Sequence, residues 1–402
     1  MAGALDGIRV VDLTTVILGP WATQMMGDMG ADVIKVETHD GDTTRRTGDG
    51  RNPAMASFFM TTNRNKRSVI LDLRKDEGRE ALFKLVGTAD VFVHNMRPAI
   101  AAKLGMKEEK FIAAYPNLIF VKAYGFRGDG PMANRPAYDD VIQAASGMAD
   151  LQTVTSKGGK PRYVPTIIAD KTGSFHVLSS VLAALFYRER TSEGQVIEVP
   201  MFESLVDYLM IEHLNGASFD PPIAEMGYAR LLSSMRKPYE TKDGYLSVLP
   251  YTDANWRDLF ELAGREDLKD DPRFVDLTTR MRNSQEIYEI LADIVSTRTC
   301  AEWQRDLDEA AIPAQTVNAK EDLLDDEQLA ATGFWRFADH PTEGRIRMTD
   351  PPVRYSKSPN SIRRLQPRLG EHSNEVLAEA GYSDEEIQTM FDNGVSAQPD
   401  EL

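Results

Sequence analysis

The chain has 402 residues and a formal net charge of −16, from 62 acidic and 46 basic residues. A chain of this length is longer than the chains that usually fold around a single hydrophobic core, so we expect two domains. The negative charge disfavours attraction to phosphate backbones and anionic lipids, and we therefore predict no nucleic-acid or membrane partner. Cys300 is the only cysteine, which excludes an intrachain disulfide and a thiolate metal cluster. Because the N-terminus lacks a secretory pattern and no apolar run approaches a membrane span, we expect a cytoplasmic protein.

The first third of the chain alternates strand patterns with helix patterns, which predicts an α/β fold. Repeated βαβ units of this kind form an open, mostly parallel sheet in a Rossmann-like domain. The loop after the first strand has no Gly-x-Gly-x-x-Gly sequence, so we do not predict a dinucleotide cofactor. The strand patterns lie at residues 8–13, 31–37, 68–73, 91–93 and 118–123, and the helix patterns at 20–29 and 76–88.

The character of the sequence changes near residue 220. There Asp243-Gly244 supplies the turn of a predicted hairpin, and helical patterns follow it. We therefore assign residues 1–220 to the large Rossmann-like domain, 221–331 to a smaller α+β domain and 332–402 to a return into the large domain. The later helical patterns lie at 254–264, 284–296, 299–311 and 373–380.

Asp170 follows an apolar stretch and precedes a long helical pattern over 176–188. Two interpretations are open at this point. The commoner one is that Asp170 only caps the helix, by accepting backbone N–H groups. The other is that the helix dipole keeps the carboxylate ionised while apolar neighbours remove its hydration, which suits covalent catalysis by aspartate. The local sequence does not decide between them.

Short segments along nearly the whole chain carry a family resemblance. They are Leu5 to Leu13, Gly19-Pro20, Gly30 to Glu37, Asn65 to Ser68, Asn95 to Pro98, Tyr138-Asp139 and Arg188 to Gln195. No single segment is distinctive, but their order and spacing are. Together they resemble the family III coenzyme A transferases, a group that includes formyl-CoA transferase, carnitine-CoA transferase and the α-methylacyl-CoA racemases.

The resemblance implies a reaction and an assembly. Asp170 would attack an acyl-CoA thioester to give an acyl-aspartyl anhydride, and returning CoA thiolate would then give an aspartyl-CoA thioester. A carboxylic acid acceptor would be activated by the mirrored steps. Coenzyme A is thus substrate and product, with no tightly bound cofactor and no metal site. The resemblance further implies a homodimer of two interlocked, ring-shaped subunits.

Other site residues follow from the same resemblance. Asp139 is expected to support Asp170, by orienting groups or by raising its pKa through like charge, although a structural turn after Pro136 is an open alternative. Arginine and lysine among the other positions suit the phosphates of CoA, but surface solvation remains open for each. The residues implied to bind CoA are Val16, Ile17, Leu71, Arg74, Asn95, Met96, Arg97, Lys103 and Tyr138.

Two departures from the family narrow the prediction. The racemases carry histidine where this chain has Tyr138, which disfavours proton abstraction; His176 is a candidate base, but a structural role is commoner. Segment 227–236 has one glycine where formyl-CoA transferase has a glycine-rich lid, which argues against oxalate and formate as substrates. Its Arg230 and Arg236 suit a dicarboxylic acid such as succinate, so succinyl-CoA is a candidate donor. A racemase, a thioester hydrolase and a non-catalytic acyl-CoA-binding protein stay open as alternatives.

Overall fold

The structure is a computed structural model of the whole chain, and it describes residues 2–154, 156 and 158–399. The chain folds into two compact units, which we call the large unit and the small unit. The chain leaves the large unit twice, first for a short segment and then for most of the small unit, and returns each time. The large unit comprises Met1–Ala149, Tyr163–Tyr208 and Ala330–Leu402, and the small unit comprises Asp150–Arg162 and Leu209–Leu329.

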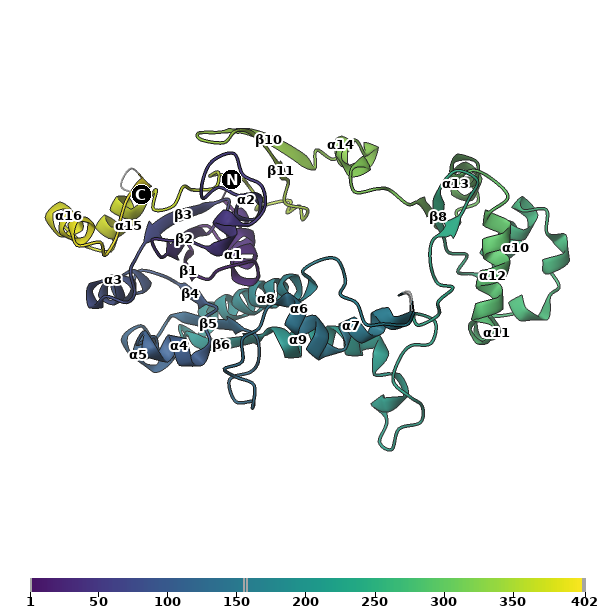
Figure 1. Cartoon of the computed structure of the whole chain (residues 1–402), viewed down its shortest axis with the longest axis horizontal. Coiled ribbons are helices and arrows are strands. Elements are labelled where there is room, and N and C mark those ends of the chain that lie inside the picture. The colour runs from purple at the N-terminus through teal and green to yellow at the C-terminus, as the bar shows by residue number, and fades with distance from the viewer. Residues whose placement is uncertain (1, 155, 157, 400–402) are drawn as a thin grey trace. The chain divides into compact units, whose positions relative to one another are not determined.

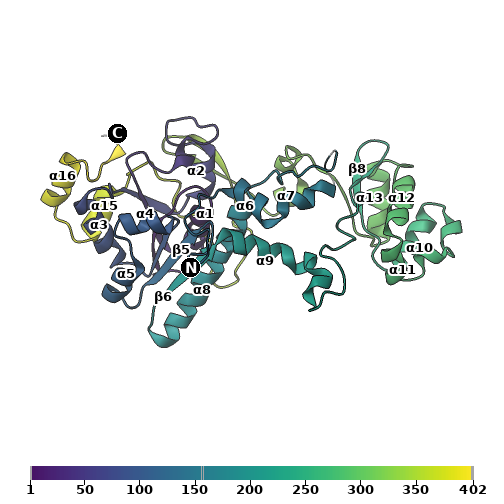
Figure 2. The same cartoon turned by 60° about the horizontal axis from the view of Figure 1, so that its bottom comes forward.

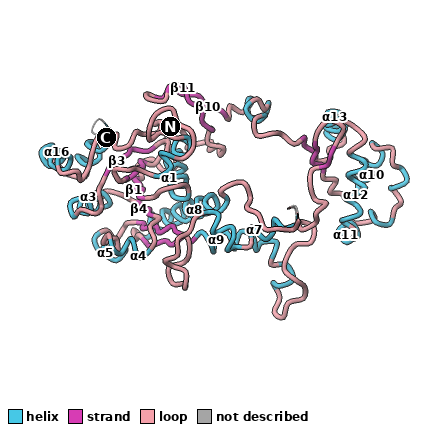
Figure 3. The backbone as a smooth tube through the Cα atoms, viewed as in Figure 1, coloured by secondary structure: helices cyan, strands magenta, loops and turns pink. Residues whose placement is uncertain are grey.

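The large unit is built on a six-stranded sheet with the order β3-β2-β1-β4-β5-β6. Every neighbouring pair of strands is parallel, which confirms the predicted mostly parallel sheet. Figure 3 shows the strands in magenta. The strand order reverses between β1 and β4, and such a switch point is where open α/β sheets bind ligands. The strands are β1 (Arg9–Leu13), β2 (Asp32–Glu37), β3 (Lys66–Ile70), β4 (Val91–His94), β5 (Ile119–Tyr124) and β6 (Gln195–Pro200), the last of which we did not predict.

Helices cover both faces of this sheet. Figures 1 and 2 agree in placing α1 and α8 on one side and α3 and α5 on the other. Short helices α2, α4 and α6 also belong to the large unit, and α7 and α9 begin in the large unit and end in the small one. Their bounds are α1 (Leu18–Asp28), α2 (Ser57–Thr62), α3 (Asp76–Val86), α4 (Pro98–Lys103), α5 (Glu108–Ala114), α6 (Asp139–Ser146), α7 (Met148–Leu151), α8 (Ile168–Thr191) and α9 (Met201–His213).

The two sheet faces differ in chemistry because successive side chains of a strand point to opposite faces. One face is apolar: Val11 of β1 and Ile34 of β2 belong to the core that α3 and α5 close. On the other face, the alternate positions carry Asp12, Lys35 and Lys66, all fully buried. Lys66 Nζ donates to the Pro20 carbonyl of α1 at 2.8 Å, so this charged face lies beneath α1.

The end of the chain returns to the large unit. Strands β10 (Trp335–His340) and β11 (Gly344–Thr349) form an antiparallel hairpin that we did not predict, because most of its residues are exposed and its apolar alternation, Ile346 and Met348 in β11, is short. Helix α15 (Ser373–Glu379) confirms the predicted short helix. Helix α16 (Asp384–Asp392) follows it, where we expected only an acidic tail.

The small unit contains a three-stranded antiparallel sheet and several helices. Its β7 and β8 pair as the predicted hairpin about Asp243-Gly244, and β9 adds to β8. No helix of the described residues is long and apolar enough to span a bilayer. The elements are β7 (Tyr239–Glu240), β8 (Tyr245–Val248), α10 (Asp253–Leu262), α11 (Leu277–Arg282), α12 (Ser284–Val295), α13 (Cys300–Glu309), β9 (Ala314–Thr316) and α14 (Glu327–Ala331), the last at the junction of the two units.

Glycine at position 19 allows α1 to begin close to the preceding loop. A Cβ atom there would lie 2.3 Å from side-chain atoms of Thr14, which is fully buried. We expect Gly19→Ala to lower the free energy of unfolding by about 1–3 kcal/mol, because the overlap must be relieved by moving the loop. Urea unfolding measures it. Gly130→Ala is the matched control, since its nearest atom would lie at 3.5 Å, and equal effects of the two variants would contradict the prediction.

Candidate active site

Loops after β1, β4 and β5 meet at the carboxyl edge of the sheet, beside the switch point. Asn95, just after β4, holds the backbone of Thr15, just after β1: its Oδ1 accepts the Thr15 N–H at 3.2 Å and its Nδ2 donates to the Thr15 carbonyl at 2.8 Å. These loops line a cavity of about 320 Å³, which we call the strand-end cavity. The predicted site residues that line it are Val16, Asn95, Met96, Arg97, Tyr138 and Asp170.

Asp170 lies in the first turn of α8 and is 7% exposed. The interpretation that it caps its own helix is wrong: Ile167 is the N-cap residue, and no side chain caps α8 from that position. The Asp170 carboxylate instead accepts the backbone N–H of Leu18, the first residue of α1, through Oδ1 at 3.1 Å. The side chain points across to another helix because the two N-termini converge, which keeps it at the wall of the strand-end cavity.

Asp139 takes the capping position that we had considered for Asp170. It is the first residue of α6, and its Oδ1 accepts the N–H groups of Ala169 at 2.7 Å and Asp170 at 3.3 Å. Its Oδ2 accepts from Gln143, one helical turn further on, at 2.6 Å. Gln143 Oε1 in turn accepts the Val164 N–H at 2.9 Å. Asp139 therefore fixes the start of α8 and the chain that leads into it.

The environment of Asp170 favours its protonated form. Burial is the largest cause and the negative charge of Asp139 the second, and together they raise the pKa of Asp170 to about 7. The Leu18 N–H opposes them by stabilising the ionised carboxylate. At neutral pH, a substantial fraction of the molecules thus holds a poorly hydrated carboxylate with high basicity, a property that suits a nucleophile.

Val16 is a strained member of the cavity wall. Its φ is +72°, in the left-handed region that β-branched residues rarely adopt. Such a conformation costs on the order of 1–3 kcal/mol and persists only when surrounding contacts hold it. Asp42 supplies one such contact, because its Oδ1 accepts the Val16 N–H at 3.1 Å. Strain of this kind is often found at binding and catalytic sites, and the role of Val16 in binding CoA stays a prediction.

A second cavity, of about 670 Å³, uses the neighbours of the same residues. Ile17 and Asp139 line this second cavity. Their chain neighbours Val16, Leu18 and Tyr138 line the strand-end cavity instead. We call the second cavity the aromatic cavity, because Trp21, Phe58 and Tyr163 also line it. The predicted residues Ile17 and Asp139 therefore border the aromatic cavity, whereas Asp170 borders the strand-end cavity.

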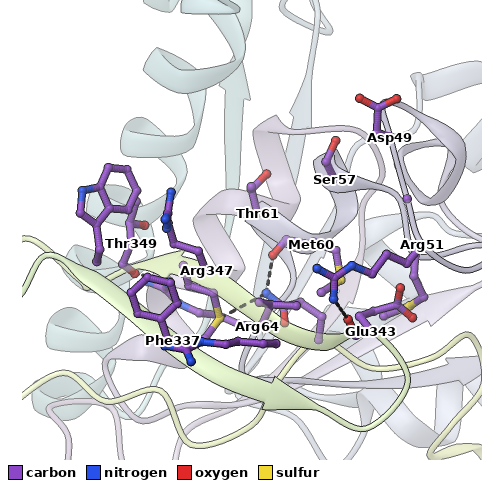
Figure 4. Close-up of a pocket in the computed structure, with 17 residues that line it drawn as sticks. Asp49, Arg51, Ser57, Met60, Thr61, Arg64, Phe337, Glu343, Arg347 and Thr349 are labelled. Carbon is purple, nitrogen blue, oxygen red and sulfur yellow. Dashed lines mark hydrogen bonds between the residues drawn. The ribbon is translucent and has the colours of Figure 1, made fainter. Parts of the chain in front are cut away.

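A third cavity, of about 820 Å³ and therefore larger than the first two, lies elsewhere (Figure 4). It lies between the start of the chain around α2 and the β10–β11 hairpin, where the Arg347 guanidinium lies 5.2 Å from the Phe337 ring centre. Arg64, on its wall, is paired with Asp28 at 2.8 Å. No predicted site residue is among those that line it, so size alone does not identify the site.

Three predicted CoA-binding residues line none of these three cavities. Leu71 is 1% exposed and belongs to the apolar core of the sheet. Arg74 is exposed and paired with Asp72 at 2.9 Å, and Lys103 is exposed at the end of α4. His176, the candidate base, lies within α8 and is also absent from the residues that line the strand-end cavity. The structure therefore does not bring a histidine to Asp170 among the described residues.

Sequence reasoning missed several residues that shape the site. Arg135 lines the strand-end cavity, and Gln143 orders Asp139; the spacing of four residues in a helix could have revealed Gln143. His94 is buried, and its Nδ1 accepts the Met96 N–H at 3.3 Å, which orders the loop after β4. Burial lowers the pKa of His94 to about 4, so it stays neutral. No sequence signal marks Leu18, because its backbone acts rather than its side chain.

Comparison with known proteins identifies the family. The model of the family described as CoA-transferase family III matches residues 5–373, which is nearly the whole chain. The chain belongs to CoA-transferase family III. The predicted family and enzyme class are thereby confirmed, and coenzyme A is the substrate that the family uses.

Individual relatives agree with this assignment. The "Succinate--glutarate CoA-transferase" of Agrobacterium fabrum is 34% identical over 388 residues, covering 93% of this chain and 95% of the relative. The "Formyl-CoA:oxalate CoA-transferase" of Rhodopseudomonas palustris is 30% identical and covers 99% of each chain. Among solved structures, the orthorhombic crystal form of Rv3272 from M. tuberculosis has a TM-score of 0.81 at 29% identity and covers 93% of this transferase and 99% of that chain. The family fold therefore extends over both units.

Proposed function

We propose that this CoA-transferase moves CoA from an acyl-CoA donor to a carboxylic acid acceptor, with Asp170 as the covalent nucleophile. The observation that carries the proposal is the Asp170 carboxylate, which is buried at the wall of the strand-end cavity with a pKa raised to about 7 by burial and by Asp139. A carboxylate in water is a weak nucleophile, and removal of its hydration increases its reactivity. Asp139 supports it by holding the start of α8.

The proposed reaction has four balanced steps. Asp170 attacks the thioester carbon of the donor, the C–S bond breaks, and CoA thiolate leaves behind an acyl-aspartyl anhydride. The thiolate then attacks the Asp170 carbonyl carbon, which releases the donor acid and leaves an aspartyl-CoA thioester. The acceptor carboxylate attacks that thioester to form a second anhydride, and the thiolate returns to the acceptor acyl carbon. Asp170 is regenerated, and the thioester energy that hydrolysis would lose is retained.

We assign CoA to the strand-end cavity and its rim. Arg97 and Arg135 are exposed cations on its lining, and guanidinium groups suit the phosphates of CoA. Arg97 also donates to the Asn134 carbonyl at 3.1 Å, which orients it. The predicted contacts of Arg74 and Lys103 with the nucleotide end remain proposals that follow from the family, and Leu71 could offer only its backbone.

Dicarboxylic acids are the substrate class that we propose, with succinyl-CoA as a donor. The name of the Agrobacterium relative includes succinate and glutarate, which are both dicarboxylic acids. We further propose the interlocked homodimer; a chain that leaves the large unit and returns to it fits that arrangement.

Incubation with succinyl-CoA and a panel of carboxylic acids tests the proposal. We expect new CoA esters in the presence of an acceptor, together with a mass adduct on the peptide that contains Asp170. Release of free CoA without an acceptor would instead indicate a thioester hydrolase, and deuterium uptake at the α-carbon would indicate a racemase. If no donor yields an ester or an adduct, the transferase assignment of this site fails.

The pH dependence of transfer follows from Asp170. Because the ionised form attacks and its pKa is about 7, kcat/KM should fall about tenfold for each pH unit below 7 and level off above it. Asp139→Asn removes the like charge, so the acidic limb should move to lower pH. Initial rates between pH 5 and 9 measure both effects. An acidic limb near the ordinary aspartate pKa in the unmodified enzyme would contradict this account of Asp170.

A further inference from the structure

The loop Thr14–Ile17 between β1 and α1 decides where the Leu18 N–H lies. That N–H donates to Asp170 Oδ1 at 3.1 Å, and the Leu18 carbonyl accepts the Ser174 hydroxyl at 2.7 Å. Both backbone groups of the first residue of α1 are therefore joined to α8. A shift of the loop would change the hydrogen bond to the proposed nucleophile.

The loop does not hold its conformation through its own sequence. Val16 has a φ of +72°, and a β-branched side chain is strained there, whereas glycine would adopt this angle without steric cost. No glycine occurs between Thr14 and Ile17. The conformation must therefore be maintained by contacts from other elements.

Two buried charged side chains hold the loop on either side of its second residue. Lys35 Nζ donates to the Thr14 carbonyl at 2.9 Å, and Asp42 Oδ1 accepts the Val16 N–H at 3.1 Å. The two also form an ion pair, with Lys35 Nζ 2.9 Å from Asp42 Oδ2, and both side chains are 0% exposed. One pair thus restrains the backbone on both sides of Thr15, up to the N–H of Val16 where the bend begins.

The charge of this pair needs an explanation other than stability. Desolvation offsets much of the attraction in a buried ion pair, and apolar side chains of similar volume are often as stable. Lys35 lies on the buried charged face of the sheet beside a second pair, Asp12 and Lys66, whose charged atoms are 3.0 Å apart. Apolar residues at positions 35 and 42 could fill the space, but they could not bind the Thr14 carbonyl and the Val16 N–H.

We propose that Lys35 and Asp42 are positioning residues for the transfer reaction: they hold Val16 in its left-handed conformation and so direct the Leu18 N–H to the Asp170 carboxylate. This inference rests on the proposed role of Asp170 as the nucleophile. The Leu18 hydrogen bond favours the ionised, attacking form, against burial and Asp139. Loss of the loop geometry therefore raises the pH at which Asp170 becomes a nucleophile.

The other charged groups around Asp170 do not change in the test that follows. Asp139 of α6 lies next to Asp170, because its carboxylate caps the first turn of α8 that contains Asp170. Four further titratable or permanently charged residues line the strand-end cavity with it. They are Arg97, Tyr124, Arg135 and Tyr138.

The decisive variant is Lys35→Met/Asp42→Ala in the full chain. Both charges are removed together, so neither is left buried without its partner. Carbon-13 NMR of aspartate carboxyl groups, with Asp170 assigned by its loss in Asp170→Asn, measures the pKa without relying on activity. We expect the pKa of Asp170 to rise by about one unit and kcat/KM at pH 7 to fall roughly 10- to 100-fold.

A matched control separates positioning from stability. Arg64→Met/Asp28→Asn removes another buried pair of the large unit, whose side chains are 6% exposed and whose charged atoms are 2.8 Å apart. We expect a comparable fall in Tm but an unchanged pKa of Asp170. Adding Val16→Gly to the Lys35→Met/Asp42→Ala variant should return the pKa toward the original value, because glycine favours the required φ.

Each outcome supports or overturns one statement. An unchanged pKa in the Lys35→Met/Asp42→Ala variant, or an equal shift in the control, would show that the pair is structural only. Failure of Val16→Gly to restore the pKa would show that the left-handed bend is not what the pair maintains. If the unmodified protein titrates at Asp170 but transfers no CoA, the proposed function fails while the positioning result stands.

Discussion

Replacing Asp170 by asparagine is expected to lower the rate of CoA transfer by roughly 10³-fold or more, because the amide cannot form the anhydride or the thioester intermediate. Binding of CoA should persist, since Arg97 and the loop after β4 are untouched. Asparagine keeps an acceptor for the Leu18 N–H, so the convergence of α1 and α8 should be preserved. Steady-state rates, together with calorimetric titration of CoA, measure the two properties separately.

The same substitution should make the protein more stable. The pKa of Asp170 is about 7 when folded and about 3.8 when unfolded, so the folded state binds the proton more tightly. Above pH 7 the ionised carboxylate is buried at a cost, and the stability that protonation supplies is present below pH 3.8 and lost as the pH rises through 7. Asparagine avoids that cost, and we expect a gain on the order of 2–4 kcal/mol at pH 8 that shrinks toward pH 4.

Asp207→Asn is the matched control for Asp170→Asn. Asp207 is an exposed carboxylate in α9 of the same large unit. We expect neither its transfer rate nor its unfolding free energy to change, because an exposed carboxylate keeps its hydration. Retention of transfer by Asp170→Asn would exclude the covalent mechanism. Loss of transfer accompanied by loss of stability would instead show that the carboxylate is structural.

The fold was predictable where strands are buried on both faces, and not where they are exposed. β1 to β5 are buried at nearly every position and each contains at least two consecutive apolar residues, and their order and parallel pairing follow from the βαβ connections. β6 and the β10–β11 hairpin escaped prediction although Val196-Ile197 in β6 and the alternating Ile346 and Met348 in β11 are typical of strands, because many of their residues face solvent and the apolar pattern is short. Their pairing depends on partners that lie far away in the sequence.

The sequence pointed to several residues that lie close together in the structure, but not to the hydrogen bonds that connect them. The family resemblance pointed to Asp170 and Asp139. In the structure Asp170 lies in the first turn of α8, and the side chain of Asp139, from α6, accepts the Asp170 N–H. Local pattern suggested that Asp170 capped its own helix, yet Asp139 performs that role and Asp170 binds the first N–H of α1. Such an exchange between helix ends requires the packing of α1, α6 and α8, which no single segment of the sequence encodes.

The second large effect is expected at the buried pair formed by Asp12 and Lys66, whose charged atoms lie 3.0 Å apart with both side chains 0% exposed. Burial alone would raise the pKa of Asp12, but Lys66 and Lys35 hold it below its usual range. Lys66→Met leaves the Asp12 carboxylate buried with one lysine fewer, so the free energy of unfolding should fall by about 3–5 kcal/mol. Urea unfolding at fixed protein concentration measures it.

The double variant Asp12→Asn/Lys66→Met shows why this pair is charged. With both charges removed, most of the lost stability should return, because desolvation offsets much of what a buried pair contributes. Arg127→Met, which breaks an exposed pair with Asp129, should change little. If the double variant is as unstable as Lys66→Met, the charges themselves stabilise the fold. If it is stable but transfers CoA slowly, the pair is retained for the geometry of Thr14, whose N–H and hydroxyl both bind Asp12 just before the bend at Val16.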